Sequence, residues 1–128
     1  MIILAIIILF GVLYYLFPII QVIGDSMFPT YLDQEFIFGR RLYLKSRLKK
    51  GDVVVYKSPD DNNRIVIKRI AYINRTLSGE LVFYFLGDNS KCSHDSRDYG
   101  FVSHKNLVCK VVNQRHRKSI DKGGNDNE

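Results

Sequence analysis

The stretch Gly24-Asp25-Ser26-Met27-Phe28-Pro29-Thr30 places a single serine among residues that favour turns. Gly24 and Asp25 tolerate unusual backbone angles, while Pro29 fixes its own φ and moves the preceding residue out of the helical region. Such a loop can hold the Ser26 hydroxyl in one position, which a nucleophile requires. An ordinary surface turn has the same composition, so the rest of the chain must decide between the two interpretations.

An apolar run, residues 1–20, precedes this loop and contains no charged residue and no Asn, Gln, Ser or Thr. Its length matches the roughly 20 residues that a helix needs to cross a bilayer. Tyr14 and Tyr15 lie near its end, where aromatic side chains favour the membrane interface. The run lacks the basic start of a secretory signal peptide, which makes a cleaved peptide the weaker interpretation. We therefore expect a retained transmembrane anchor over residues 1–20.

The remaining chain is long enough for one small domain with a single core, since the whole sequence has 128 residues. The net charge is +6, but the basic residues mix with acidic ones and form neither a stripe nor a known nucleic-acid-binding module. We therefore expect no nucleic-acid partner, and a basic surface near anionic lipid is the simpler explanation. Basic residues after the anchor favour a cytosolic body, although whole domains can be translocated regardless of charge.

Two cysteines, Cys92 and Cys109, are too few for a disulfide scaffold and belong to no metal-binding motif. One disulfide between them and two free thiols are both compatible with the sequence. We expect no metal site.

Short β-branched and aromatic runs alternate with turn-forming residues after the serine loop. They predict strands at 35–39, 53–56, 65–73, 81–86 and 107–112. This spacing is typical of a mainly β fold, a compact barrel or sandwich, rather than of βαβ units. We expect this β domain over residues 21–113, and a polar, disordered tail over residues 114–128.

Lys68 lies inside the apolar run 65–73. Because side chains alternate across a strand, Lys68 shares one face with Val66 and Ile70, while Arg69 points to the other face. A lysine among such neighbours loses hydration, its pKa falls, and the neutral amine can act as a general base. The alternative is a lysine that extends from the strand edge to water.

The loop 87–100 is rich in hydroxyl, carboxylate and basic side chains. Asp95 and Arg97 can pair and make the loop rigid, and Ser93 can form a hydrogen bond with a buried amine. A solvated loop of turn-forming residues is the alternative. His94 suggests a Ser-His-Asp triad, but its polar surroundings indicate an exposed side chain.

Four blocks of sequence, taken in this order, resemble bacterial-type signal peptidase I, a serine–lysine peptidase family. The blocks are Gly24-x-Ser26-Met27-x-Pro29-Thr30, Gly51-Asp52-Val53-Val54-Val55-Tyr56, Lys68-Arg69-Ile70, and Gly87-Asp88-Asn89 through Ser93-x-Asp95-Ser96-Arg97 to Gly100. The match continues from Phe101-Val102 to Lys110-Val111-Val112. Residues 69–86 are too few for the variable cap domain of larger members, so the chain resembles a minimal member that lacks this domain.

The resemblance implies a fold of the signal-peptidase type and a role for each matching residue. Ser26 is expected to be the nucleophile, with its backbone N–H in the oxyanion hole, and Lys68 the base that deprotonates it. Ser93 is expected to orient the lysine amine. No cofactor or metal is implied.

The resemblance also implies supporting and substrate-binding residues. Asp95 and Arg97 are expected to pair and brace the site, with Asp88 nearby. Val22 and Met27 are expected to line small pockets, which suit the small side chains at the −1 and −3 positions of a signal-peptide cleavage site.

The expected function is removal of N-terminal signal peptides from exported preproteins by a single-pass membrane enzyme, with its catalytic domain on the extracytoplasmic side. Its expected partners are preproteins, the lipid bilayer and the secretion machinery. Two alternatives remain open. One is a maturation protease dedicated to a single short-leader protein, and the other is a non-catalytic, membrane-anchored β-barrel that binds a partner.

Overall fold

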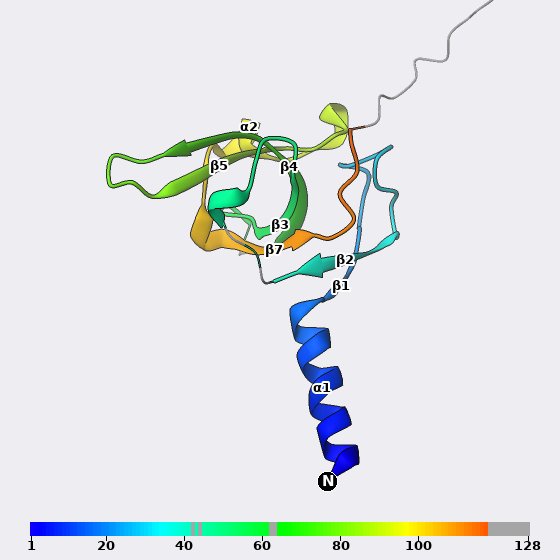
Figure 1. Ribbon diagram of the computed structural model, residues 1–128. Helices are drawn as coiled ribbons and strands as arrows, with labels where there is room; N and C mark the ends of the chain where they lie inside the picture. Colours follow the sequence, from blue (N-terminus) through cyan, green and yellow to red (C-terminus); the bar gives the residue numbers. More distant parts are fainter. Residues whose placement is uncertain (42, 44, 62–63, 118–128) are drawn as a thin grey trace, which may run out of the picture.

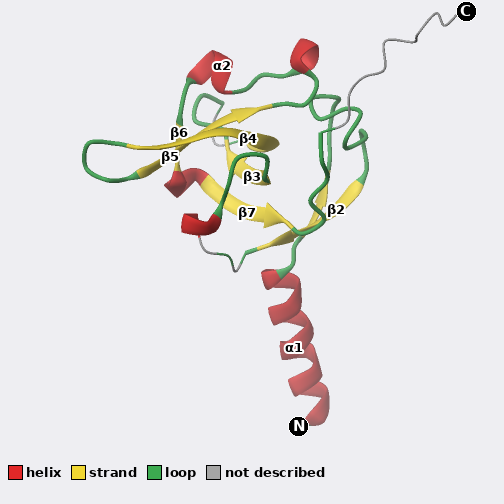
Figure 2. Cartoon of the chain, turned by 45° about the horizontal axis from the view of Figure 1, so that its top comes forward, coloured by secondary structure: helices red, strands yellow, loops and turns green. Residues whose placement is uncertain are grey.

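The computed structural model describes residues 1–41, 43, 45–61 and 64–117. In these residues, seven strands form one sheet in the order β1-β2-β7-β3-β4-β5-β6, and neighbouring strands are antiparallel. The strands are β1 (Ile19–Gln21), β2 (Phe36–Arg40), β3 (Val53–Lys57), β4 (Ile65–Arg75), β5 (Leu81–Leu86), β6 (Val102–Ser103) and β7 (Leu107–Val111). The sheet curls into a half-barrel, and helix α1 (Ile2–Leu16) projects from one end of the domain (Figures 1 and 2).

The mainly β prediction is confirmed, as a single curled sheet. Every predicted strand is present, and its ends differ from the prediction by no more than two residues. Strand β1 was not predicted because two of its three residues lie at the end of the apolar run 1–20, where pattern alone does not separate strand from helix. Its pairing with β2, with Ile20 opposite Ile37, is a long-range contact. Strand β6 has only two residues and carries no recognisable pattern.

The helix of the apolar run is shorter than the expected anchor, which corrects that prediction. Helix α1 ends at Leu16, Phe17 leaves the helical region, and Pro18 cannot continue the hydrogen-bond pattern because it lacks an N–H. The chain then enters β1, and the Pro18 carbonyl accepts a hydrogen bond from Gly39 at 2.8 Å. Among the described residues, no helix has both the length and the apolar character needed to cross a membrane.

Two apolar clusters fill the two faces of the sheet. One contains Val53 and Val55 of β3, and the other contains Val54 and Tyr56. Strand β3 is therefore buried on both faces, which explains why its sequence is a continuous apolar run rather than an alternating one. The Tyr56 ring stacks on Phe85 with centroids 4.1 Å apart. This packing gives β3, and β4 beside it, a fixed position from which side chains reach the candidate site.

The end of the described chain is attached to the domain. Gln114 accepts a hydrogen bond from the Val53 N–H at 2.7 Å and donates one to the Val53 carbonyl at 2.8 Å. Arg115 forms an ion pair with Glu35. The predicted tail 114–128 therefore begins too early, and residues 118–128 lie outside the described part. Both cysteines are free thiols, Cys92 exposed and Cys109 buried.

Candidate active site

The Ser26 loop is fixed on both sides of the serine. Gly24 adopts φ +87°, a left-handed conformation that favours glycine, and its N–H donates to the Asp33 carboxylate at 2.8 Å. On the other side, the Met27 side chain is fully buried in the core. The backbone that bears the Ser26 hydroxyl is therefore fixed on both sides of the serine.

Asn89 holds the same loop from across the domain. Its backbone N–H donates to the Ser26 carbonyl at 2.9 Å, and its side-chain amide donates to the Asp25 carbonyl at 3.0 Å. Sequence analysis assigned Asn89 no role. The only indication was its place in the Gly87-Asp88-Asn89 block, because its contacts join residues that are far apart in the chain.

Lys68 reaches the serine from the middle of β4. Its Nζ and the Ser26 Oγ are 2.6 Å apart, a hydrogen bond that the ammonium donates. The Lys68 side chain pairs across the sheet with Val54 of β3, and only 4% of the residue is exposed. The lysine therefore does not extend to water, and the alternative of a solvated strand-edge lysine does not hold.

Burial is the main influence on the charge of Lys68. It lowers the pKa of the amine from 10.5 to about 8, because the ammonium loses hydration. The negative charge of Asp95 acts in the opposite direction and raises the pKa, while Arg64 and Arg97 lower it. A substantial fraction of the amine is therefore neutral near neutral pH and can accept the serine proton.

A cavity of about 470 Å³ opens beside the two residues. Its walls include Ile23 before the serine and Val66 next to Lys68 on β4, which makes the lining partly apolar. Val22 and Met27, which were expected to line small pockets, are buried in the core and are not among the residues that line this cavity, so their role in substrate binding stays a prediction. The chain at 19–22 is extended, so alternate side chains point inward, and Val22 points into the core.

A family model described as signal peptidase, peptidase S26, matches residues 1–73, a span that includes both Ser26 and Lys68. The chain belongs to the signal peptidase family. Membership makes it a serine peptidase in general terms and confirms the resemblance drawn from the sequence blocks. No curated protein matches the chain.

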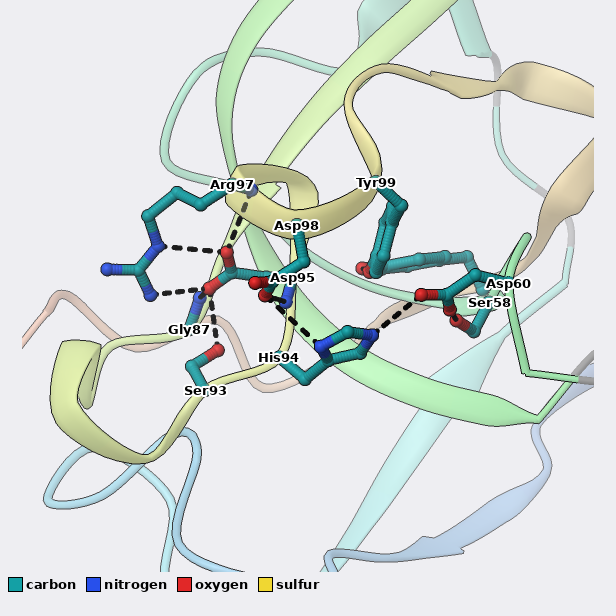
Figure 3. Close-up of polar contacts among 10 residues, drawn as sticks. Ser58, Asp60, Gly87, Ser93, His94, Asp95, Arg97, Asp98 and Tyr99 are labelled. Carbon is teal, nitrogen blue, oxygen red and sulfur yellow. Dashed lines mark hydrogen bonds and ion pairs between the residues drawn. The ribbon is translucent and has the colours of Figure 1, made fainter.

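The matched span ends before the loop that carries Asp95. Asp95 is fully buried and caps the short helix α2 (Ser96–Tyr99). Figure 3 shows its carboxylate between the Arg97 guanidinium, the Gly87 backbone and the Ser93 hydroxyl. The two bonds from the guanidinium measure 2.9 and 2.7 Å, so the predicted Asp95–Arg97 pair is present. Burial alone would raise the pKa of Asp95, but these hydrogen bonds outweigh it and hold the pKa below its usual range.

Among the described residues, Ser93 makes no hydrogen bond to the Lys68 amine, which differs from its expected role. Its hydroxyl donates to Asp95 at 2.6 Å. Gly87 lies between Ser93 and the serine loop, and a Cβ at Gly87 would fall 2.1 Å from the Ser93 Oγ and 2.6 Å from the Ser26 carbonyl oxygen. This close packing places the Ser93 hydroxyl against the carboxylate, and it requires glycine at position 87.

Asp88 also has a partner that the sequence blocks did not indicate. Both of its oxygens accept hydrogen bonds from Arg69 at 2.8 Å, and Arg69 donates a further bond to the Gly51 carbonyl at 2.7 Å. Asp88 therefore braces β4 on the face opposite to Lys68.

His94 is exposed, as predicted, and its contacts do not form a triad with Ser26. Its ring nitrogens lie 2.7 Å from Asp60 and 3.2 Å from Asp98, as Figure 3 shows. The hydrogen bond that the protonated ring donates to Asp60 is the main reason that the pKa of His94 is raised. Within residues 1–41, 43, 45–61 and 64–117, no group of three or more His, Cys, Asp or Glu side chains could hold a metal ion.

Proposed function

We propose that this chain is a serine endopeptidase that removes N-terminal signal peptides from exported preproteins, with Ser26 as nucleophile and Lys68 as general base. The observation that carries the proposal is the 2.6 Å contact between the Lys68 Nζ and the Ser26 Oγ, made by a lysine that is almost completely buried. A nucleophile within hydrogen-bond reach of a base of lowered pKa is the arrangement that acyl transfer needs.

The reaction proceeds through an acyl-enzyme. The neutral amine of Lys68 takes the proton of Ser26, and the Oγ attacks the carbonyl carbon of the scissile bond. When the tetrahedral intermediate collapses, the Lys68 ammonium returns the proton to the departing amine of the mature protein. Lys68 then takes a proton from water, which attacks the ester. When this second intermediate collapses, the Lys68 ammonium gives the proton to the departing Ser26 Oγ, and the signal peptide is released as a carboxylic acid that ionises in water.

The backbone N–H of Ser26 would stabilise the oxyanion. Among the described residues, this N–H donates no hydrogen bond to another backbone group, so it is available to the substrate. Asn89 keeps the donor in place through its bonds to the carbonyls of Asp25 and Ser26. Donors held in position before the reaction stabilise developing charge without reorganisation.

The cavity supports a preference for small side chains before the cleaved bond. Ile23, Ile65 and Ile67 contribute branched aliphatic side chains to its wall. Such side chains offer apolar contact to the substrate segment that precedes the cleaved bond. We therefore propose cleavage after small residues at the −1 and −3 positions.

Attachment to a membrane is part of the proposal. Helix α1 has 15 residues, none of which is charged or buried against the domain. Its length is ~22 Å at 1.5 Å per residue, compared with a hydrocarbon core of ~30 Å. The uncharged, exposed surface of α1 supports its insertion into lipid, although α1 alone is shorter than the hydrocarbon core, and we propose that the catalytic domain lies on the extracytoplasmic side, where the cleavage regions of preproteins emerge.

The test is cleavage of a panel of preproteins by the full chain in detergent. Ser26→Ala should fold normally and lose cleavage by roughly 10⁴-fold or more, as removal of a nucleophile commonly does. Ser78→Ala is the matched control, because Ser78 is exposed in the turn between β4 and β5, and it should cleave at the wild-type rate. Wild-type rates in Ser26→Ala would disprove the proposal.

A further inference from the structure

A second cavity of about 470 Å³ lies on the other side of β4 from the serine. The described residues that line it include four cationic side chains and one carboxylate. They are Lys50, Arg69, Arg97, Arg117 and Asp88. We call this the basic cavity. Tyr72 and Ser90 also line it and supply an aromatic wall and a hydroxyl.

The basic cavity carries more positive than negative charge. Both oxygens of Asp88 are occupied by Arg69, so this carboxylate neutralises one cation only. Arg97 is paired with Asp95, yet 40% of its side chain is exposed. Lys50 contacts the Tyr72 ring at 5.6 Å, and among the described residues neither Lys50 nor Arg117 forms an ion pair with an acid. The cavity therefore presents surplus positive charge with unused N–H donors, which suits an oxyanion.

The basic cavity shares a wall with the candidate active site. Gly87 lines the cavity, and its N–H donates to Asp95 at 2.9 Å. The other side of Gly87 packs against the Ser26 carbonyl, where a Cβ would come within 2.6 Å. Arg97 also lines the cavity and holds Asp95, so its charge acts on both sites.

Figures 1 and 2 show how the basic cavity lies relative to helix α1, which bears on whether an anion would reach the cavity from a membrane or from solution. Helix α1 leaves the domain at one end, and the last described residues, at 115–117, lie at the opposite end. Arg117 is part of the cavity wall. A lipid surface that holds α1 would therefore lie away from the basic cavity, which favours a soluble ligand over a lipid headgroup.

We propose that the basic cavity binds a phosphate group carried by a soluble molecule, and that this binding slows peptide cleavage near neutral pH. The kinetic part of this inference rests on the proposed function, whereas the binding part does not. Phosphate offers several acceptor oxygens, which match the donors of Lys50, Arg97 and Arg117.

The slowing follows from the charges that act on Lys68. These are Asp95 and Arg97 at α2 and Arg64 before β4. An anion beside Arg97 offsets the repulsion between this guanidinium and the Lys68 ammonium, which stabilises the ammonium and raises the pKa of the lysine. Less of the amine is then neutral at pH 7. Well above the pKa of Lys68, the anion should have no effect, because the amine is neutral with or without it.

Binding is tested by calorimetric titration of inorganic phosphate into the full chain carrying Ser26→Ala, so that catalysis plays no part. We expect saturable binding that falls by about tenfold in affinity when Lys50→Gln and Arg117→Gln are added, because two charge-assisted contacts are lost. Lys57→Gln with Lys105→Gln is the control, since both lysines are exposed and neither lines the cavity. Absence of phosphate binding, or equal loss in the control pair, would overturn the proposal.

The kinetic arm uses the wild-type chain in phosphate and in chloride at equal ionic strength. We expect kcat/KM at pH 7 to be about three- to tenfold lower in phosphate, which corresponds to roughly half to one pH unit in the pKa of Lys68, and unchanged at pH 10. The Lys50→Gln, Arg117→Gln variant should abolish the difference. Vesicles of phosphatidylglycerol form a third arm. An effect seen with these vesicles and not with inorganic phosphate would reject the soluble source.

Discussion

Lys68 and Arg69 are neighbours on β4 that point to opposite faces of the sheet and have opposite surroundings. Arg69 makes two hydrogen bonds to Asp88 and a third to the Gly51 carbonyl, so its charge is fully neutralised. Lys68 has no carboxylate in contact and bonds instead to the Ser26 hydroxyl. Both are largely buried, so the difference lies in their partners and not in their exposure.

The difference shows how one strand can carry a structural cation and a reactive one. A paired, buried guanidinium keeps its proton and stabilises the fold only while its partner remains. A buried ammonium without a carboxylate in contact is disfavoured relative to the neutral amine, and the pKa of the lysine is therefore lowered. Asp95 moderates this effect through space, because it raises the pKa of Lys68 without a direct bond.

Replacement of Lys68 should give the largest effect on activity. We expect Lys68→Met to lose cleavage by roughly 10⁴-fold or more, since the base is gone, and Lys68→Arg to be nearly inactive, since a guanidinium does not release its proton. Single-turnover cleavage of a preprotein measures the loss. Lys57→Met is the control, because Lys57 is exposed at the end of β3, and it should retain the wild-type rate. An active Lys68→Arg enzyme would show that Lys68 is not the base.

Breaking the ion pair between Arg69 and Asp88, on the face of β4 opposite to Lys68, should lower the stability of the fold. We expect Asp88→Asn to lower the free energy of unfolding by about 3 kcal/mol, because Arg69 is left buried without its partner. Urea denaturation measures this change in the free energy of unfolding. The control is Asp61→Asn, whose ion pair with Arg64 is exposed at 3.8 Å and should contribute almost nothing. Equal effects of the two substitutions would remove the contrast between the faces of β4.

The pH dependence of cleavage reports on Lys68 directly. The pKa of about 8 predicts that kcat/KM rises with pH up to about 8 and then levels. A profile that is flat from pH 6 to 10 would contradict a lysine base.

The same pKa predicts a change in stability. The folded value of about 8 lies below the ordinary 10.5, so between these values the unfolded chain binds more protons, and the free energy of unfolding should rise with pH. Subtracting the pH profile of Lys68→Met removes the contribution of other titrating groups. No difference between the two proteins in this range would mean that Lys68 is solvated.

Substitution of His94 should give the smallest effect. His94 is exposed, its bonds go to Asp60 and Asp98, and it makes none to Ser26. We expect His94→Gln to change kcat/KM by less than about twofold, because exposed ion pairs contribute little. A loss comparable with that of Lys68→Met would point to a triad instead of a dyad.

The strands could be predicted from the sequence because their patterns are local. Residues 81–86 form a strand with the predicted ends, since an apolar run between turn-forming residues specifies it. Strand β1 was missed for the converse reason, because Ile19 and Ile20 have the same apolar character as the preceding helix, and their strand conformation depends on pairing with β2. The length of the expected anchor, residues 1–20, was overestimated for the same reason.

The chemical elements of the site were also readable, whereas their connections were not. Ser26, Lys68 and the Asp95–Arg97 pair follow from the sequence blocks. The partner of Ser93 and the bonds of Asn89 depend on how closely Gly87 packs against the serine loop. No local pattern encodes a contact of this kind, since it results from closure of the domain.

The sequence by itself determined the β-rich domain, the apolar character of the first residues, and the choice of Ser26 and Lys68 as candidate site residues. The tertiary structure decided which groups meet. Ser26 and Lys68 are 42 positions apart, and their 2.6 Å contact exists only once β4 is packed beside the serine loop. The lowered pKa of Lys68 likewise follows from burial, which removes water from the ammonium, and hydration of a side chain is a property of the folded molecule and not of its neighbours in sequence.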